Sequence, residues 1–280
     1  MAVNERTRSQ RRHRVYVVVS MILMAILAIL FIFPFYWIIT GSLKLEPEAL
    51  PPEWFPHGFT SEHYAKLFRQ PAGRWMFNSV FMSVCSMALV LITSSMAGYA
   101  LAKKPFTGRK VVFSLLICAM ALPKQVVLVP LVRIMNTIGI YDNLWAVILP
   151  TVGWPFGTFL MKQFSETLPT ELLEAAKIDG AGEARTFTQI VCPIIKPAFG
   201  ALAIFTFINT WNDYFLQLIM LTSRRNLSIA LGIATLQAEM STDYGLIMAG
   251  ATLGAVPIVL IFVLFQKYFT NGITMGAVKG

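Results

Sequence analysis

Residues 15–39 read VYVVVSMILMAILAILFIFPFYWII, an apolar run without a single charged side chain. A helix of about 20 predominantly apolar residues is long enough to cross the hydrocarbon core of a membrane. The run is too long for the hydrophobic part of a cleaved signal peptide, it contains Pro34, and no convincing cleavage site of small residues follows it. We therefore expect an uncleaved transmembrane helix here.

The composition of the whole chain has the same character. Hydrophobic residues make up 56% of the 280 residues and charged residues only 13%, whereas a soluble domain has about 25% charged residues. This excludes an ordinary cytoplasmic enzyme, a disordered chain and a disulfide scaffold. Cys85, Cys118 and Cys192 lie far apart in or beside apolar runs, which disfavours redox or zinc chemistry. The net charge of +9 comes from basic residues at the ends of apolar runs, which indicates topology rather than nucleic-acid binding.

Five further apolar runs follow the first, and we predict an all-α integral membrane protein with six transmembrane helices in one transmembrane domain. The expected spans are residues 15–39, 75–102, 111–135, 143–161, 197–223 and 244–268. The expected tails are residues 1–14 and 269–280, and the two long loops are residues 40–74 and 162–196.

Basic residues predict the orientation of these spans. With six spans both termini lie on one side, and the tails together with the loops after the second and fourth spans carry most of the Lys and Arg. Such an excess is typical of the cytoplasmic face. We therefore expect a multi-pass protein of the cytoplasmic membrane with both termini in the cytoplasm. The external loop, residues 40–74, is expected to be an ordered cap with a short helix at residues 61–68.

The cytoplasmic loop contains the most specific pattern, LPTELLEAAKIDG at residues 168–180. Pro169 suits a first helical turn, Glu171 and Glu174 favour the positive end of a helix, and Gly180 suits a C-terminal cap. These signals predict a short helix at the cytoplasmic membrane face. Its apolar stripe is expected to consist of Leu172, Leu173 and Ala176.

A second short helix is expected at about residues 183–191, ended by Pro193. The bend between the two helices is built from small residues, which let another surface approach closely. They are Ala175, Ala176, Gly180, Ala181 and Gly182. An amphipathic elbow lying on the membrane without a partner is the alternative interpretation.

The segment Glu174-Ala175-Ala176, three residues, Gly180, nine residues, and Ile190-Val191-Cys192-Pro193 resembles the EAA loop of ABC-importer permeases, EAA-x3-G-x9-I-x-L-P, with Cys192 in place of the usual Leu. Other matching segments extend the resemblance over nearly the whole chain. They are Asn78-Ser79, Trp211-Asn212-Asp213, Trp54-Phe55-Pro56, residues 59–64 and residues 271–280. The sequence is most similar to the second, smaller permease of maltose-type carbohydrate uptake systems.

The resemblance implies a type I importer permease that moves a di- or oligosaccharide by alternating access. It implies four kinds of partner: a second, homologous permease, two cytoplasmic ATP-binding subunits, an external solute-binding protein and the lipid bilayer. No metal or catalytic residue is expected, and ATP and Mg are expected only in the partner ATPase, because the sequence has no GxxxxGK[ST] motif. The residues implied at the contact with that ATPase are Glu171, Glu174, Ala175, Ala176, Asp179, Gly180, Ala181, Gly182 and Pro193.

Two charged residues, Lys124 and Asp213, lie well away from the ends of expected spans, where a charge costs roughly 2.5–3.5 kcal/mol on insertion scales and usually marks a pathway or a partner. Lys124 and Asp213 are expected at similar depth, about 20–24 Å from the cytoplasmic ends of their helices. An ion pair or a shared vestibule is therefore a hypothesis. The candidate pathway residues are Trp211, Asn212, Asp213, Tyr214, Lys124 and Trp154. Packing against a partner helix, or a kink at Gly153–Pro155, would explain the aromatic members equally well.

Three other functions remain as alternatives. A glycerol-phosphate-type ABC permease would resemble the same family. A stand-alone secondary transporter using Asp213 as an ion site should show paired broken helices in two halves, and no such repeat is visible. A membrane enzyme is disfavoured because His13, His57 and His63 lie outside the spans and neither HExxH nor GxSxG occurs.

Overall fold

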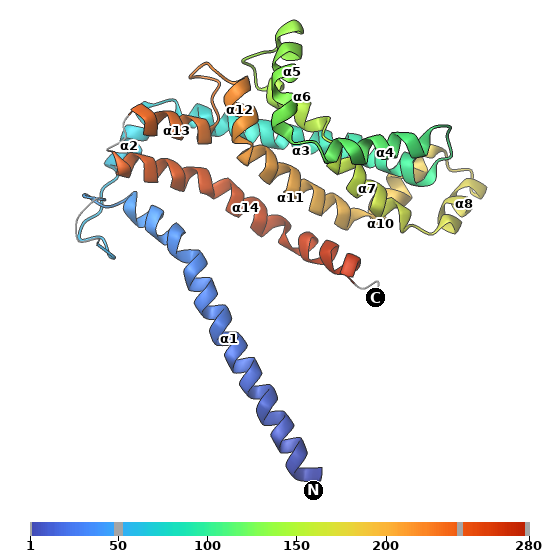
Figure 1. The fold of residues 1–280 in the computed structure, drawn as a ribbon, viewed down its shortest axis with the longest axis horizontal. Helices are drawn as coiled ribbons and strands as arrows, with labels where there is room; N and C mark the ends of the chain where they lie inside the picture. Colours follow the sequence, from blue (N-terminus) through green and yellow to red (C-terminus); the bar gives the residue numbers. More distant parts are fainter. Residues whose placement is uncertain (1, 48–52, 240–242, 278–280) are drawn as a thin grey trace. The chain divides into compact units, whose positions relative to one another are not determined.

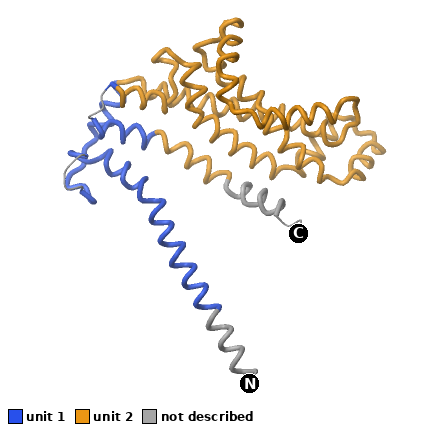
Figure 2. The backbone as a smooth tube through the Cα atoms, in the orientation of Figure 1, with its two compact units in different colours: residues 1–69, 239–253 blue, residues 70–238, 254–280 orange. Residues whose placement is uncertain are grey.

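The computed structural model describes residues 2–47, 53–239 and 243–277, and their side chains from residue 13 to residue 265. Pro51 and Pro52 of the external loop, and the side chains of both tails apart from those of residues 13 and 14, lie outside the described part. The described residues are helical (Figure 1), with one isolated antiparallel bridge between Lys44 and Phe59. Two compact units are formed by residues 1–69 with 239–253 and by residues 70–238 with 254–280 (Figure 2).

The helices of the first unit and the long carboxyl-terminal helix are α1 (Ala2–Gly41), α2 (Glu62–Arg69) and α14 (Tyr244–Ala277). The other elements are α3 (Ala72–Lys103), α4 (Arg109–Met120), α5 (Lys124–Thr137), α6 (Trp145–Val152), α7 (Phe156–Glu166), α8 (Thr170–Ile178), α9 (Glu183–Thr186), η1 (Phe187–Val191), α10 (Cys192–Ile194), α11 (Lys196–Asn212), α12 (Tyr214–Met220) and α13 (Ile229–Glu239).

Three described helices are long and apolar enough to cross a membrane: His13–Gly41 in α1, Ala72–Lys103 in α3 and Tyr244–Phe265 in α14. Two further pairs pass the same test if each bent pair is one span. Arg109–Met120 and Lys124–Thr137 are bent by 104°, and Glu183–Ile194 and Lys196–Asn212 by 79°. The all-α membrane fold is thus present, with up to five spans by this measure, and the count of six stays a prediction.

Several spans that were expected to be continuous helices are divided into shorter helices. The third expected span breaks before Lys124, at Pro123, whereas Pro130 remains inside α5. The fifth breaks at Asp213, whose carboxylate accepts a hydrogen bond from the Leu216 amide at 3.3 Å and so starts α12. The Leu216 amide therefore binds the Asp213 side chain instead of a backbone carbonyl at the end of α11, so α11 does not continue into α12.

The second limb of the loop at residues 162–196 also differs from expectation. Pro193 does not end the helix, because it lies near the start of α10, directly after the π-helical segment η1, and the helical path continues to Ile194. Proline is tolerated in a first helical turn, where its missing amide hydrogen has no partner to lose. The break falls at Ile195 instead, before α11.

The first unit joins α1, α2 and the beginning of α14. Thr252 donates a hydrogen bond to the Ile38 carbonyl at 3.3 Å, and Gly41 leaves room for Met248, whose sulfur would lie only 2.1 Å from an added Cβ. The short helix expected at residues 61–68 is confirmed as α2. It is held by buried His63, whose Nε2 donates to the Lys44 carbonyl at 3.0 Å.

In the second unit α3 is the central helix and packs against α6, α7 and α11. Its approach to α7 is close because small residues face each other. A Cβ at Gly98 would lie 2.6 Å from the Lys162 amide nitrogen, and one at Gly157 would meet the hydroxyl of Ser94. Small residues at such contacts let helix backbones pack tightly within a membrane.

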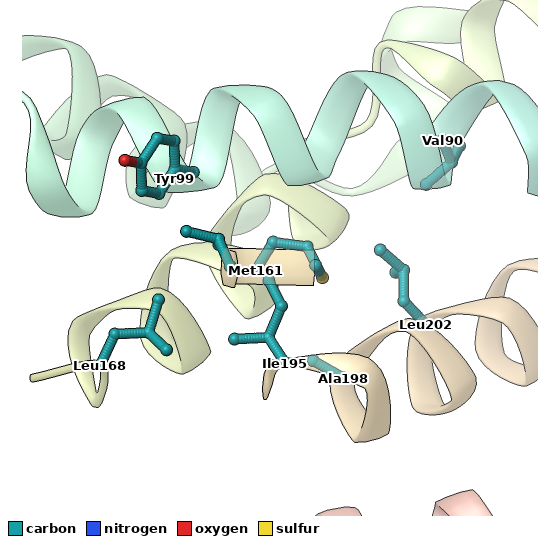
Figure 3. Packing of buried hydrophobic residues seen from close by; sticks show 8 residues of the cluster. Val90, Tyr99, Met161, Leu168, Ile195, Ala198 and Leu202 are labelled. Atoms are coloured by element: carbon teal, nitrogen blue, oxygen red, sulfur yellow. The ribbon is translucent and has the colours of Figure 1, made fainter. Parts of the chain in front are cut away.

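A hydrophobic cluster lies between α3, the end of α7 and the start of α11 (Figure 3). Tyr99 and Val90 point from α3 toward Leu168, Ile195 and Leu202 on the facing segments. All of these residues are at most 5% exposed. The loop expected on the cytoplasmic side, residues 162–196, therefore begins and ends on the same core.

Candidate functional site

The expected helix in the cytoplasmic loop is present as α8, directly after Pro169. It ends at Ile178, and Gly180 adopts a φ of +76°, a backbone conformation that residues with a Cβ rarely take. The bend from Asp179 to Gly182 is followed at once by α9. The two-helix elbow predicted from the sequence is thus confirmed as a structure.

Burial divides the surface of α8 into two faces. Ala176 is 4% exposed, and Leu173 packs against the hydrophobic cluster of α3 and α11. Leu172 was expected on the same buried stripe, but 43% of its surface is exposed. The helical periodicity places it on the flank rather than at the centre of the buried face.

The opposite face of α8 is exposed and consists of Glu171, Glu174, Ala175 and Ile178. Ile178 is 86% exposed, more than any other large apolar side chain in the described part of the chain. Sequence reasoning missed it, although it follows Glu171 by seven residues and therefore falls on the same helical face.

The remaining expected contact residues are not all in one place. Asp179, Gly180 and Gly182 are exposed in the bend, and Ala181 is half-buried beside them. Ala176 faces the core, as described above. Pro193 is exposed but lies in α10 on the second limb, away from the bend in the chain. The structure therefore brings together the bend and the outer face of α8.

The second candidate site is a cavity of about 340 Å³ within the second unit, beside the breaks between α4 and α5, α6 and α7, and α11 and α12. Its wall consists of Val90, Met120, Lys124, Gln125, Val127, Leu128, Leu131, Pro150, Thr151, Trp154, Phe156, Gly157, Leu202, Phe205, Thr206, Asn209, Asp213, Phe215 and Leu216. Interrupted helices at membrane depth are tolerated where they line a cavity or are buried in protein.

The ion pair considered from matching depth is present in this wall. The Lys124 ammonium lies 3.2 Å from Oδ2 of Asp213 and 5.1 Å from the ring centroid of Trp154. The other carboxylate oxygen of Asp213 accepts from the Leu216 amide. Lys124 is the first residue of α5, where the positive end of the helix dipole disfavours a cation. The negative charge of the Asp213 carboxylate offsets this repulsion.

Aromatic rings and neutral polar groups share the rest of the wall. Phe156 and Phe205 lie with ring centroids 4.1 Å apart, next to the amide of Asn209 and the hydroxyl of Thr206. Flat apolar faces beside hydrogen-bonding groups suit a sugar, whose rings have apolar faces and hydroxyl edges. Gln125 adds a second amide.

The predicted pathway residues divide into two groups. Lys124, Trp154 and Asp213 line the cavity, whereas Trp211 is 4% exposed and stacks on Phe207, with ring centroids 5.7 Å apart. Asn212 and Tyr214 are also outside the lining residues. Asn209 was missed, although it precedes Asp213 by four residues, one helical turn.

Comparisons with known proteins agree with this geometry. Residues 91–274 match the family model described as the inner membrane component of binding-protein-dependent transport systems. The arabinooligosaccharides transport system permease protein AraQ of Bacillus subtilis is 33% identical, over 95% of this chain and 97% of its own length. The melibiose/raffinose/stachyose import permease protein MelC of the same organism is 32% identical, over 92% and 95%.

Two further matches are to a permease and to a solved structure with other compounds in their names. The sulfoquinovosyl glycerol transport system permease protein SmoH of Agrobacterium fabrum is 33% identical, over 89% of each chain. A crystal structure of a bacterial ABC transporter involved in the import of the acidic polysaccharide alginate matches with a TM-score of 0.81 and 20% identity, covering 91% of this chain and 97% of that one. That likeness shows the shared fold.

The helical fold, the broken helices around a cavity that combines apolar and polar groups, and the exposed elbow are features of a membrane transport subunit. The chain belongs to the family of binding-protein-dependent transport system inner membrane components. It is a permease subunit of an ABC importer, in which a separate partner hydrolyses ATP. The resemblance seen in the EAA segment is thereby confirmed.

Proposed function

We propose that this permease moves a neutral di- or oligosaccharide into the cell by alternating access, and that the sugar contacts the cavity in the second unit. The observation that carries the proposal is the wall of that cavity, where aromatic faces and neutral polar groups surround a single ion pair. The names of AraQ and MelC, which concern neutral oligosaccharides, support the same substrate class.

The charge balance of the wall favours a neutral substrate over an acidic one. Lys124 and Asp213 are the two charged residues of the lining, and their opposite charges lie in contact. An acidic ligand would have to compete with Asp213 for the ammonium. A glycerol phosphate, the alternative substrate, needs surplus positive charge for its phosphate group. This wall offers none.

The elbow supports a role in coupling. Its exposed face, with Ile178 between acidic residues and the tight bend, suits a cleft on a cytoplasmic ATP-binding subunit. In this proposal two such subunits lie beneath this chain and a second homologous permease, and an external solute-binding protein delivers the sugar. The six spans, the cytoplasmic termini and the roles of the coupling and pathway residues all belong to this proposal.

The proposed cycle needs only rigid elements and one source of energy. ATP closes the pair of ATPase subunits and draws the two elbows together. The broken helices around the cavity then change their inclination, and the cavity opens alternately to the two sides of the membrane. Broken helices are suited to this movement because the chain can bend at Pro123 and Asp213 without loss of regular hydrogen bonds.

The proposal is tested with the importer complex purified through a tag on this chain and reconstituted in proteoliposomes with its solute-binding protein. The probes are radiolabelled raffinose, lactose and arabinotriose, with glycerol 3-phosphate and trigalacturonate as charged comparisons. We expect ATP-dependent import of at least one neutral sugar. Lys124→Glu and Asp213→Lys should each lower its rate by about tenfold, and the double variant should partly restore it.

Arg133→Glu provides a matched control, because it reverses a charge on the exposed side of the same helix α5, outside the cavity wall. It should import at the rate of the unmodified complex. ATP-dependent import of glycerol 3-phosphate or trigalacturonate without any neutral sugar would overturn the proposed substrate class. Failure of the double variant to recover would count against the pair as part of the pathway.

A further inference from the structure

The last residue of α3 and the residue after it reach the two ends of the elbow. The Lys103 ammonium donates to the carbonyls of Leu168 at 2.5 Å and Glu166 at 3.3 Å, where the chain leaves α7. The Lys104 ammonium forms an ion pair with Glu183, the first residue of α9. Two neighbouring residues at the end of α3 thus bind the entry and the exit of the segment that contains α8 and its bend.

Ring contacts reinforce these two attachments. The Lys104 ammonium lies 5.3 Å from the ring centroid of Tyr99, one helical turn back along α3. The Tyr99 ring lies 5.5 Å from that of Phe187 in η1, and Figure 3 shows Tyr99 pointing into the cluster that contains Leu168. The end of α3 therefore contacts both limbs of the elbow through apolar and charged groups together.

The charge and position of both lysines favour these contacts. Burial lowers the pKa of Lys104, but the hydrogen bond and charge of Glu183, with Tyr99, outweigh this and raise that pKa above its ordinary value. The ammonium therefore stays charged at every physiological pH. Lys103 binds carbonyls at the carboxyl end of α7, where helix carbonyls lack partners and the helix dipole favours a cation.

We propose that Lys103 and Lys104 are positioning residues that transmit movement of the elbow to α3 during the transport cycle. The inference rests on the proposed function, because it requires that the elbow contacts the ATPase. A segment attached at one end can pivot, whereas one attached at both ends to the same helix moves that helix with it. Since Val90 of α3 lines the cavity, movement at the elbow reaches the cavity wall directly.

The central test uses charge reversal at the exit of the elbow. Lys104→Glu and Glu183→Lys should each lower the number of sugar molecules imported per ATP hydrolysed by about threefold to tenfold. The ATPase should still copurify and should keep hydrolysing ATP. The double variant restores opposite charges at the same two positions and should regain most of this ratio. A residue that serves only folding would change the yield of the complex and leave the ratio unchanged.

The entry of the elbow is tested with substitutions that keep the length of the side chain. Lys103→Met should lower the same ratio, whereas Lys103→Arg, which can still donate to the carbonyls, should keep it. Lys110→Glu is the matched control for Lys104→Glu, because Lys110 is an exposed lysine six residues beyond Lys104, at the start of α4. It should leave the ratio unchanged.

The outcomes separate this inference from the function on which it rests. If the unmodified complex imports none of the sugar probes, the proposed function fails. If it imports sugar and Lys104→Glu, Glu183→Lys and Lys103→Met all keep the original ratio, the transmission role is overturned. Equal loss in the single variants and in the double variant would also overturn it, because restored charge complementarity would then have no effect.

Discussion

The two ends of α3 are held by opposite kinds of contact. At its amino-terminal end the Trp75 indole donates to the Arg224 carbonyl at 2.7 Å, and the Asn78 amide donates to the carbonyls of Arg225 and Leu227, both at 2.9 Å. At its carboxyl-terminal end Lys103 and Lys104 hold the elbow, as described above. The first set is neutral, and Trp75 and Asn78 are fully buried; the second is charged and partly exposed.

This difference separates a fixed end from an adjustable one. A buried hydrogen bond is expensive to break, because the groups left behind have no water to bind. A partly exposed ammonium can exchange its partner for water at little cost, and single exposed ion pairs contribute at most about 1 kcal/mol. The helix is therefore anchored firmly at its amino-terminal end, whereas each contact with the elbow is weak on its own and the elbow is held by its entry and exit contacts together.

The largest expected effect comes from filling the space beside the fixed end. Gly232 of α13 lies against Trp75, and a Cβ there would come within 2.1 Å of the indole ring. Gly232→Leu should lower the free energy of unfolding by about 3 kcal/mol, the upper end for overpacking. Thermal unfolding of the purified complex measures this. Gly73→Leu on α3, where an added Cβ meets nothing within 4 Å, is the control; equal loss in both would contradict the close packing.

An intermediate effect is expected when the hydrogen bonds of the fixed end are removed. Asn78→Ala leaves two backbone carbonyls without their donor and should cost about 1–3 kcal/mol. Hydrogen exchange should then speed up in residues 225–229. Lys103→Met, at the other end of the same helix, should change the unfolding free energy much less. Similar losses at the two ends would refute the division into a fixed and an adjustable end.

The smallest effect concerns a carboxylate near the fixed end. Burial raises the pKa of Asp142, but hydrogen bonds from Ser223, Thr222 and Asn226 outweigh this and hold that pKa below its ordinary value of 3.8. The stabilisation is therefore complete above pH 3.8 and is lost as the pH falls through the folded-state pKa.

Asp142→Asn provides the matched variant for this pH dependence. The unmodified complex should be the more stable of the two at pH 7, by less than about 1 kcal/mol because the site is partly exposed. The difference between their unfolding temperatures should shrink on acidification below pH 3.8. A difference that stayed constant down to the lowest pH would show that the carboxylate charge plays no part there.

Local signals in the sequence were sufficient for some features of the sites. Pro169 and Gly180 lie a few residues from the helix they delimit, so the elbow follows from backbone preferences alone. The similar depths expected for Lys124 and Asp213 in the membrane indicated that they could pair. They are 89 residues apart in the sequence, however, and only the packing of their helices makes them neighbours. The run Trp211–Tyr214 was read as one pathway, although helical geometry turns Trp211 into the core and leaves only Asp213 in the cavity wall.

The sequence by itself determined that the chain is a helical membrane protein, that a two-helix elbow interrupts it, and that its family is that of ABC-importer permeases. These properties depend on composition and on residues close together in the chain. Only the tertiary structure decided where the spans break around a cavity, that Ile178 is exposed, and that Lys103 and Lys104 hold both ends of the elbow. Such contacts join distant segments, and their free energy depends on which helices become neighbours, a choice that no local pattern specifies.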